Sequence, residues 1–221
     1  MFRLLVVAAT LLATVDLTRA DDPKASSDAE FVDNSLELFD GQTLKGWEGN
    51  GYWFRVEDDC IVAGRSDEDI PHNFFLCTAD HYDDFELRLE VKIIGPGQNA
   101  GVQFRSKRLP GGSEVSGYQA DAGRAFDRSV WGALYDESRR RKMLAEGDPE
   151  LVKRLTKDGQ WNHLRIVCKG NQIEIFLNGE QTVDYTEEDA EIPNHGLIAL
   201  QIHSGPATEA WYRNIRVRHF K

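Results

Sequence analysis

Apolar and polar residues alternate with a period of two along much of the chain. Phe85, Leu87 and Leu89 point to one side of an extended strand, and the residues between them are polar. Similar segments, rich in β-branched and aromatic residues, recur from residue 36 onward. The segments predicted as strands are 52–56, 60–63, 74–78, 85–94, 101–106, 131–135, 164–169, 173–177, 197–203 and 211–218.

Tight turns and one helical segment complete the predicted fold. Gly170-Asn171 and Asn178-Gly179 suit two-residue turns, so residues 161–185 are predicted to form a three-stranded meander. Residues 136–156 have a helical composition, and Asp148-Pro149 is a good helix start, so two short helices are expected there. The predicted fold class is all-β, an antiparallel β-sandwich (jelly roll) with a short helical insertion.

Polar residues on these strands predict a binding groove. Alternation directs Val102, Leu200 and Ile202 into the core and their polar neighbours to the opposite face. Polar residues expected on that face are Gln103, Arg105, Gln119, Asp121, Gln201 and His203. Their side chains are short, directional hydrogen-bond partners, whereas a solvated sheet face usually carries long flexible ones. A small polar ligand is therefore expected, with a solvated face as the alternative for any single residue.

Aromatic and acidic residues extend this predicted groove. The aromatic residues are Trp131 and Tyr135, and the acids are Asp136 and Glu137, followed by the basic Arg139. Aromatic faces stack on sugar rings and carboxylates bind hydroxyl pairs, so a small carbohydrate is the expected partner. In the alternative interpretation Trp131 belongs to the core and Tyr135 closes the sandwich. The turn at Pro96-Gly97 is also expected to pair the strands around it, which would put Glu90 beside Gln103.

The N-terminal residues have the features of an export signal. Arg3 precedes an apolar stretch over residues 4–15, and Thr18-Arg19-Ala20 ends with a small residue. Residues 1–20 are therefore predicted as a signal peptide cleaved before Asp21, and the protein as secreted or periplasmic. A buried N-terminal element and an uncleaved anchor are the alternatives.

The remaining chain is predicted as a flexible lead-in over residues 21–34 and one β-sandwich domain over residues 35–221. The formal net charge is −11, and removal of residues 1–20 takes away two positive charges and one negative charge, which leaves −12. Such an acidic protein is not expected to bind nucleic acid or an anionic membrane.

Three cysteines, Cys60, Cys77 and Cys168, fit no metal-binding spacing. In an oxidising compartment a Cys60–Cys77 disulfide is the favoured pairing. Three buried free thiols are the alternative.

Short motifs along the chain resemble, in order and spacing, the 3-keto-disaccharide hydrolase domain family. The motifs begin with Leu38-Phe39-Asp40-Gly41 and Gly46-Trp47, and continue with Phe85-Glu86-Leu87-Arg88, Asn99-Ala100-Gly101-Val102, Gly117-Tyr118-Gln119-Ala120-Asp121, Trp131-Gly132-Ala133-Leu134-Tyr135, Phe176-Leu177-Asn178-Gly179 and Leu200-Gln201-Ile202-His203. The resemblance covers about residues 36–218. It implies a concanavalin A-like lectin/glucanase sandwich and action on glycosides oxidised at C3.

A 3-keto group acidifies the C2 proton, so a general base can remove it and the C1 leaving group can depart, after which water adds back. For this chemistry His203 is the expected base, because imidazole titrates near neutrality. The other expected catalytic residues are Asp121 and Glu137, and the expected substrate-binding residues are Gln103, Arg105, Gln119, Trp131, Tyr135, Arg139 and Gln201. A divalent metal ion is a possible cofactor, with Asp121, Glu137 and Glu90 as candidate ligands, although no spacing identifies a metal site.

Two other functions fit the same face. A non-catalytic carbohydrate-binding module would use a similar groove, because a fold does not establish an activity. An ordinary retaining glycosidase would need two carboxylates ~5–5.5 Å apart. Glu86 and Glu90 have a suitable spacing on one strand, but Arg88 lies between them. The oligomeric state is left open.

Overall fold

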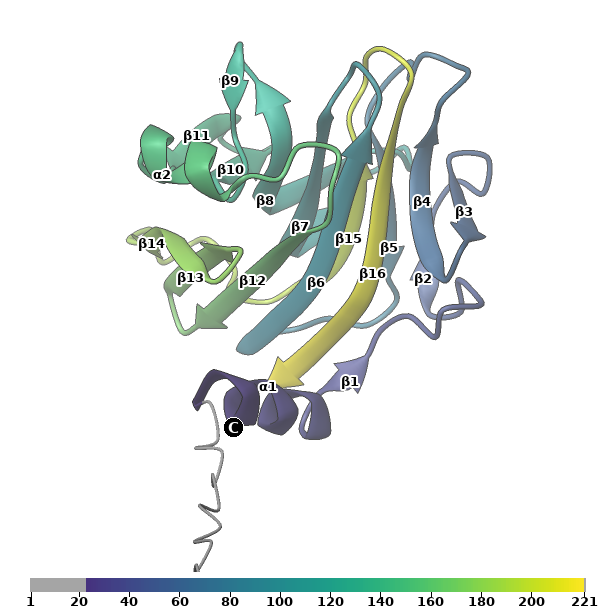
Figure 1. Ribbon diagram of the computed structural model, residues 1–221. Coiled ribbons are helices and arrows are strands. Elements are labelled where there is room, and N and C mark those ends of the chain that lie inside the picture. The colour runs from purple at the N-terminus through teal and green to yellow at the C-terminus, as the bar shows by residue number, and fades with distance from the viewer. Residues whose placement is uncertain (1–22, 221) are drawn as a thin grey trace, which may run out of the picture.

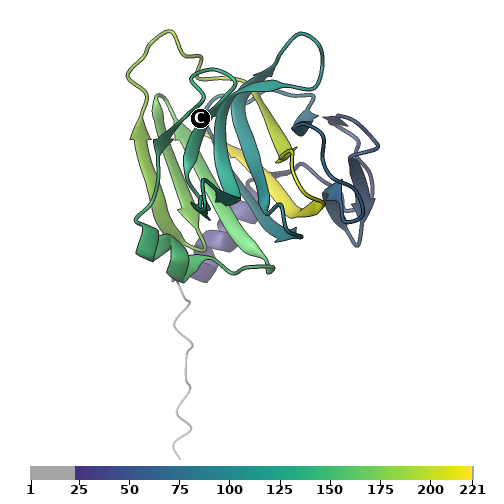
Figure 2. The ribbon, with the colours of Figure 1, turned by 90° about the horizontal axis from the view of Figure 1, so that it is seen from above.

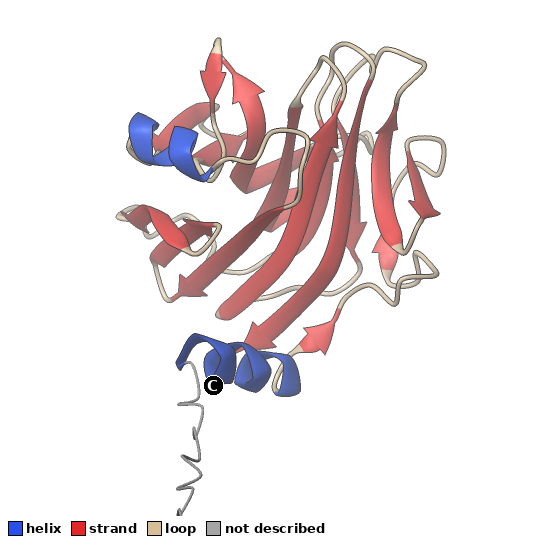
Figure 3. Ribbon diagram, viewed as in Figure 1, coloured by secondary structure: helices blue, strands red, loops and turns tan. Residues whose placement is uncertain are grey.

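Two antiparallel β-sheets lie face to face and enclose the hydrophobic core (Figure 1). The computed structural model describes residues 23–220, so the predicted signal peptide over residues 1–20 lies outside the described part. Strands dominate the described chain, and the helices lie at its periphery (Figure 3). The predicted antiparallel β-sandwich is therefore confirmed.

Sheet A is the layer that contains the C-terminal strand. Its hydrogen-bonded order is β14 (Glu180–Thr186), β13 (Gln172–Leu177), β12 (Asn162–Lys169), β6 (Phe85–Ile94), β16 (Thr208–His219), β4 (Cys60–Arg65) and β3 (Phe54–Glu57), and β1 (Leu36–Glu37) pairs with β16. The strands β14 and β3 lie at opposite ends of the molecule in both views (Figures 1 and 2). The last strand of the chain, β16, thus lies inside this sheet rather than at its edge.

Sheet B is the second layer. Its order is β11 (Lys142–Ala145), β10 (Leu134–Glu137), β8 (Val115–Ala125), β7 (Asn99–Arg108), β15 (Leu197–Ile202), β5 (Phe74–Thr78) and β2 (Trp47–Glu48), and β9 (Arg128–Ser129) pairs with β8. The apolar side of each sheet faces the other. Leu87 and Leu89 of sheet A pack in one fully buried cluster with Val102 and Leu200 of sheet B, as their alternation predicts.

The predicted meander is confirmed as β12, β13 and β14. Each of these strands pairs with the next in antiparallel register. Between β13 and β14, Asn178 and Gly179 have φ values of 50° and 94°. A type I′ turn requires positive φ at both central residues, which Asn and Gly adopt with little strain.

The first of the two helices predicted within residues 136–156 is wrong. This part of the chain forms the hairpin of β10 and β11, and β10 also pairs with β8. The buried carboxylate of Asp136 accepts a hydrogen bond from Arg139 Nε at 2.8 Å and another from Arg140 Nε, which fixes the turn. Strand pairing and this buried ion pair outweigh the intrinsic helix preference of the arginine and lysine residues, because tertiary contacts readily override propensity.

The second predicted helix is confirmed as α2 (Pro149–Leu155). Asp148 is its N-cap, and the Asp148 carboxylate accepts a hydrogen bond from the Leu151 backbone N–H at 2.9 Å. Pro149 occupies the first turn, where a missing N–H costs no helical hydrogen bond.

Residues 21–34, predicted as a flexible lead-in, contain the helix α1 (Pro23–Asp33), so that prediction is corrected. Phe31 is buried, and the guanidinium of Arg88 lies 4.0 Å from the centre of its ring. Arg88 also forms a 2.6 Å ion pair with Asp28. An aromatic contact and an ion pair therefore hold α1 against the outer face of sheet A. The polar composition of residues 21–34 gives no sign of these contacts.

The strands β6 and β7 do not pair, so the expected proximity of Glu90 and Gln103 is wrong. The strand β6 lies between β12 and β16 in sheet A, and β7 lies between β8 and β15 in sheet B. Glu90 accepts a 2.8 Å hydrogen bond from Arg213 in sheet A. The connection passes through positive φ at Gly95 (115°) and Gln98 (43°), and it carries the chain from one sheet to the other.

All three cysteines are buried and free, which is the second of the two alternatives predicted for them. Cys60 lies on β4 of sheet A and Cys77 on β5 of sheet B, so they belong to different layers. Within residues 23–220, no helix is long and apolar enough to cross a membrane.

Candidate functional site

Neighbouring strands of sheet B carry polar side chains on the outer face of the sheet. In the register of the strands, Gln201 of β15 lies opposite Gly101 of β7, and Gly101 lies opposite Asp121 of β8. Two residues along, Gln103 of β7 lies opposite Gln119 of β8. Directly paired residues share a face of the sheet. The structure therefore brings the three glutamines and Asp121 together, as the sequence predicts.

A chain of hydrogen bonds, here called the amide network, joins these side chains. Ser106 Oγ donates to Gln103 Oε1 at 2.8 Å, and Gln103 Nε2 donates to Gln119 Oε1 at 2.8 Å. Gln119 Nε2 then donates to Asp121 Oδ1 at 2.7 Å. Each amide both donates and accepts, so the network fixes the orientation of the Asp121 carboxyl group.

Gly101 makes room for the amide network. It lies between Gln201 and Asp121 across the strands, and a β-carbon at this position would overlap the side chain of Gln119. Gln119 therefore lies across the bare backbone of Gly101 to reach Asp121. This close approach explains why the position has no side chain.

Asp121 is an acid with a pKa near neutrality. Burial raises the pKa of Asp121 to about 7, and the nearby carboxylate of Glu137 also raises it, against the hydrogen bond from Gln119. Among the described residues, only Gln119 donates a side-chain hydrogen bond to this carboxyl group. A carboxyl group with these properties can take up or release a proton near pH 7.

Glu137 is the second acid of the site. Burial and the carboxylate of Glu114 raise its pKa, while the Ser138 hydroxyl and the charge of His203 lower it. Gln201 Nε2 donates to Glu137 Oε2 at 3.3 Å. Two carboxyl groups with raised pKa values thus lie on one face of sheet B, where the charge of Glu137 acts on Asp121.

His203 follows β15 directly and acts electrostatically on Glu137. Its Nδ1 lies 2.7 Å from the carbonyl oxygen of Ser204. A hydrogen bond to a carbonyl requires the proton on Nδ1, which leaves Nε2 as the acceptor of a neutral imidazole. His203 therefore belongs to the site, half-buried at its rim.

Tyr135 of β10 lies opposite Gln119 and shares the same face. Burial and the carboxylates of Glu137 and Asp121 raise the pKa of its half-buried hydroxyl. Tyr135 thus remains a hydrogen-bond donor beside both acids across the physiological range.

An open cleft of about 900 Å³ adjoins the site at β5 and β2. Phe75 lines this cleft, and it lies opposite Gln201 in the register of β5 and β15. Tyr52, which is 55% exposed, and His72 also line the cleft. Arg108 reaches the backbone oxygen of Glu48 with a 2.7 Å hydrogen bond. Aromatic faces, carboxylates and a guanidinium around one cleft suit a hydroxyl-rich ligand.

The described residues form no group of three or more side chains arranged to hold a metal ion. Asp121 Oδ1 is already engaged by Gln119, and Glu137 Oε2 by Gln201. The predicted ligand set of Asp121, Glu137 and Glu90 is also divided between the two sheets, because Glu90 lies in sheet A.

The 3-keto-alpha-glucoside-1,2-lyase-like domain family matches residues 34–218 of the chain. The chain belongs to this family. The resemblance stated from the short motifs is therefore confirmed.

Individual relatives agree with the family. A 3-keto-disaccharide hydrolase from Bacteroides thetaiotaomicron is 23% identical over 235 residues, which cover 85% of this chain and 79% of that protein. The crystal structure of a candidate glycosyl hydrolase from Parabacteroides distasonis matches with a TM-score of 0.63 at 16% identity, over 88% of this chain and 97% of the other. The carbohydrate-binding module CBM66 from Bacillus subtilis matches with a TM-score of 0.56 at 15% identity, over 78% of this chain and 95% of that module. These structures show a shared lectin-type fold. The family match and the curated relative indicate a carbohydrate-acting hydrolase-like or lectin-fold protein.

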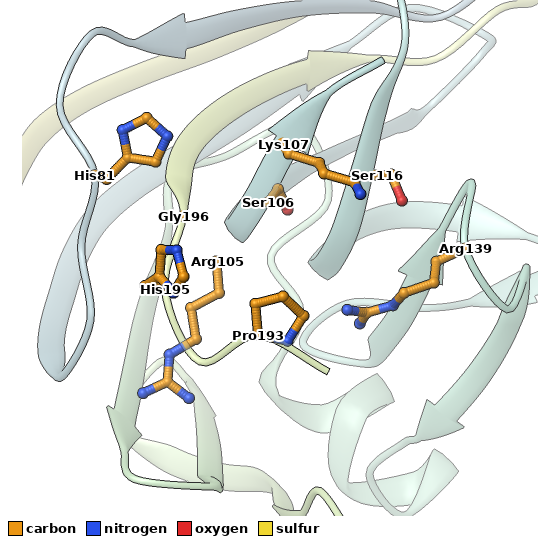
Figure 4. Close-up of a pocket in the computed structure, with 9 residues that line it drawn as sticks. All are labelled: His81, Arg105, Ser106, Lys107, Ser116, Arg139, Pro193, His195 and Gly196. Atoms are coloured by element: carbon orange, nitrogen blue, oxygen red, sulfur yellow. The ribbon is translucent and has the colours of Figure 1, made fainter. Parts of the chain in front are cut away.

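Arg105 does not lie on the polar face, and that prediction is wrong. A bulge between Phe104 and Lys107 breaks the alternation, and Arg105 has a φ of 45°. Its guanidinium donates to the Asp83 and Gly170 carbonyl oxygens and to the Asp84 carboxylate. In Figure 4 the guanidinium points away from Lys107.

Two more predicted substrate-binding residues lie elsewhere. Trp131 is buried in the hydrophobic core, as the alternative interpretation has it. Arg139 pairs with Asp136, and its guanidinium lies 4.5 Å from the centre of the Tyr118 ring. Arg139 lines a different cavity, together with Lys107 and Ser116.

Two predicted ligand contacts are fully covered by protein. Gln103 and Gln201 each have 0% of their surface exposed, whereas Asp121 has 6%. The two amides therefore position the acids rather than meet a ligand. Sequence reasoning missed the cleft residues Tyr52 and His72. Tyr52 is included in the strand predicted over residues 52–56, and no motif in the sequence marks His72.

Proposed function

We propose that the chain is an enzyme that cleaves 3-keto-glucosides by removing the C2 proton. The observation that carries this proposal is the pair of acids with raised pKa values, Asp121 near 7 and Glu137 beside it. Family membership over residues 34–218 supports the substrate class.

Asp121 is proposed as the base, in place of the His203 expected from the sequence. The carboxylate of Asp121 takes the proton from C2, and the electrons of the C–H bond form an enolate at the C3 oxygen. The enolate then collapses, C1=C2 forms, and the C1–O bond breaks. Glu137 gives its proton to the departing oxygen, so charge and protons balance. Water added across C1=C2 completes a net hydrolysis.

Tyr135 and His203 are proposed to assist at the rim of the site. The Tyr135 hydroxyl lies on the same face as both acids, where it can donate to the enolate oxygen. His203 lies close enough to Glu137 to affect the pKa of that carboxyl group, so it can tune the acid that protonates the leaving oxygen. The adjoining cleft would then hold the group attached at C1.

The test is turnover of a 3-keto-glucoside, with deuterium exchange at C2 measured in parallel. Asp121→Asn is expected to lose at least ~100-fold in kcat and in exchange, the usual contribution of a general base. Glu137→Gln is expected to slow product formation more than exchange. Glu180→Gln, an exposed acid on β14, is the matched control and should behave like the parent. Equal activity of Asp121→Asn and the control would overturn the assignment of the base.

A non-catalytic carbohydrate-binding protein is the second candidate. The aromatic cleft and the match to a carbohydrate-binding module favour it. Saturable binding of the 3-keto-glucoside to the parent protein, with neither product nor C2 exchange, would establish this function and exclude the first.

Export of the protein is also proposed, from the signal-like residues 1–20. N-terminal sequencing of the protein recovered from the host's periplasm or medium should begin at Asp21. Recovery of the intact Met1 terminus in the cytoplasmic fraction alone would contradict this proposal.

A further inference from the structure

A second cavity lies where β7 ends and β8 begins, at the side of the meander (Figure 4). Its volume is about 150 Å³. It is lined by Lys107 of β7, Ser116 of β8, Arg139 of the β10–β11 turn, and His195 just before β15. His81 completes the rim. The residues thus come from segments far apart in the sequence.

The charged side chains that line this cavity are all basic, in a protein whose formal net charge is −11. The positive charge of Arg105 is balanced by Asp84, and that of Arg139 is shared with Asp136. Lys107 is exposed and forms no ion pair with any described residue. A local excess of positive charge therefore remains at the cavity.

Two further donors at the cavity lack partners. The Nη2 group of Arg139 is buried and has no hydrogen-bond partner among the described residues. A buried N–H group without a partner is costly, and it commonly marks the place of a water or an ion. The Ser116 hydroxyl makes no hydrogen bond with a described residue either, and Figure 4 shows the Lys107 ammonium directed toward Ser116.

We propose that this cavity binds a tetrahedral oxyanion, phosphate or sulfate, either free or as an ester on a sugar. Lys107 supplies the charge, and Arg139 Nη2 and Ser116 Oγ supply directed hydrogen bonds. Ser106 lines the same cavity and donates to Gln103, so the site adjoins the amide network. The proposal does not depend on the activity proposed above.

The experiment is an NMR titration of the full chain with inorganic phosphate, inorganic sulfate and glucose 6-sulfate. Binding is expected as saturable shifts of the Ser106, Lys107 and Gly196 amides. Lys107→Met should weaken binding at least about fivefold, the effect of losing one charge-assisted contact. Lys45→Met, an exposed lysine near β2, should keep the affinity of the parent.

The arms of the titration separate the sources of the anion. Tighter binding of glucose 6-sulfate than of inorganic sulfate assigns the anion to a carbohydrate, and tighter binding of the inorganic ions assigns it to free anion. Arg139→Lys keeps the charge but removes the directed N–H group, so it should also weaken binding. Absence of saturable shifts at tens of millimolar anion, or equal weakening by Lys45→Met, would overturn the proposal.

Discussion

At the scale of single residues, Asp121 links the stability of the protein to pH. Because burial raises its pKa to about 7, the folded protein holds a proton that the unfolded chain releases near pH 4. The free energy of unfolding should therefore fall as pH rises from about 4 to about 7, and then level off. The ionised carboxyl group of Asp121 therefore lowers the free energy of unfolding above about pH 7.

Asp121→Asn should remove this cost. The variant is expected to be more stable than the parent at about pH 8, by at most ~4 kcal/mol, and the difference should disappear near pH 4. Urea unfolding at both pH values measures it. A stability difference that is the same at both pH values would show that Asp121 does not titrate as described.

Gly101 offers a second test at this scale. Gly101→Ala places a methyl group where Gln119 now lies, so it should destabilise the protein by about 1–3 kcal/mol and disturb the hydrogen bond to Asp121. Gly51→Ala is the matched control, because a β-carbon at Gly51 meets nothing within 4 Å. Thermal unfolding of the two variants compares them directly, and equal losses would contradict the close approach of Gln119 to Gly101.

Alternation in the sequence predicted the shared face of Gln103, Gln119, Asp121 and Gln201 because these strands keep their period. It failed for Arg105, where a bulge turns the side chain away. Alternation also does not predict how far a side chain is buried. Gln103 and Gln201 were therefore expected to contact a ligand, although other side chains cover them. A period of two predicts which face of the sheet a side chain lies on, but it does not predict which other residues cover that face.

At the scale of elements, the sequence predicted what depends on local residues. The turns at Gly170 and Asn178-Gly179 and the helix start at Asp148 follow from backbone preferences of those residues. The β10–β11 hairpin and the separation of β6 from β7 depend on partners distant in sequence. Composition carries no signal for such partners, so both were predicted wrongly.

The helix α1 should contribute to stability through Phe31. Phe31→Ala removes a buried ring from the outer face of sheet A, and it should cost about 2–4 kcal/mol, near the lower range for phenylalanine. Val32→Ala on the exposed side of α1 is the control, with a change within about 0.5 kcal/mol. Denaturant unfolding of both variants tests the packing of α1, and two equally small effects would show that α1 is not docked.

At the scale of the whole molecule, the two sheets keep all three thiols out of solvent. Burial raises the pKa of Cys77 to about 11 and of Cys168 to about 12, so neither is a thiolate near pH 8. A thiol reagent should therefore modify no cysteine in the native protein and three after unfolding without reductant. A count of one after unfolding would reveal a disulfide.

The position of β16 inside sheet A has a consequence for biosynthesis. The strands β6 and β4 can reach their final neighbours only when residues 208–219, which are far from both in the sequence, arrive between them. The nascent chain therefore cannot complete sheet A until this distant strand has been synthesised, and its folding depends on long-range pairing. Until β16 arrives, the strand edges of β4 and β6 that it will cover remain open to pairing with other chains.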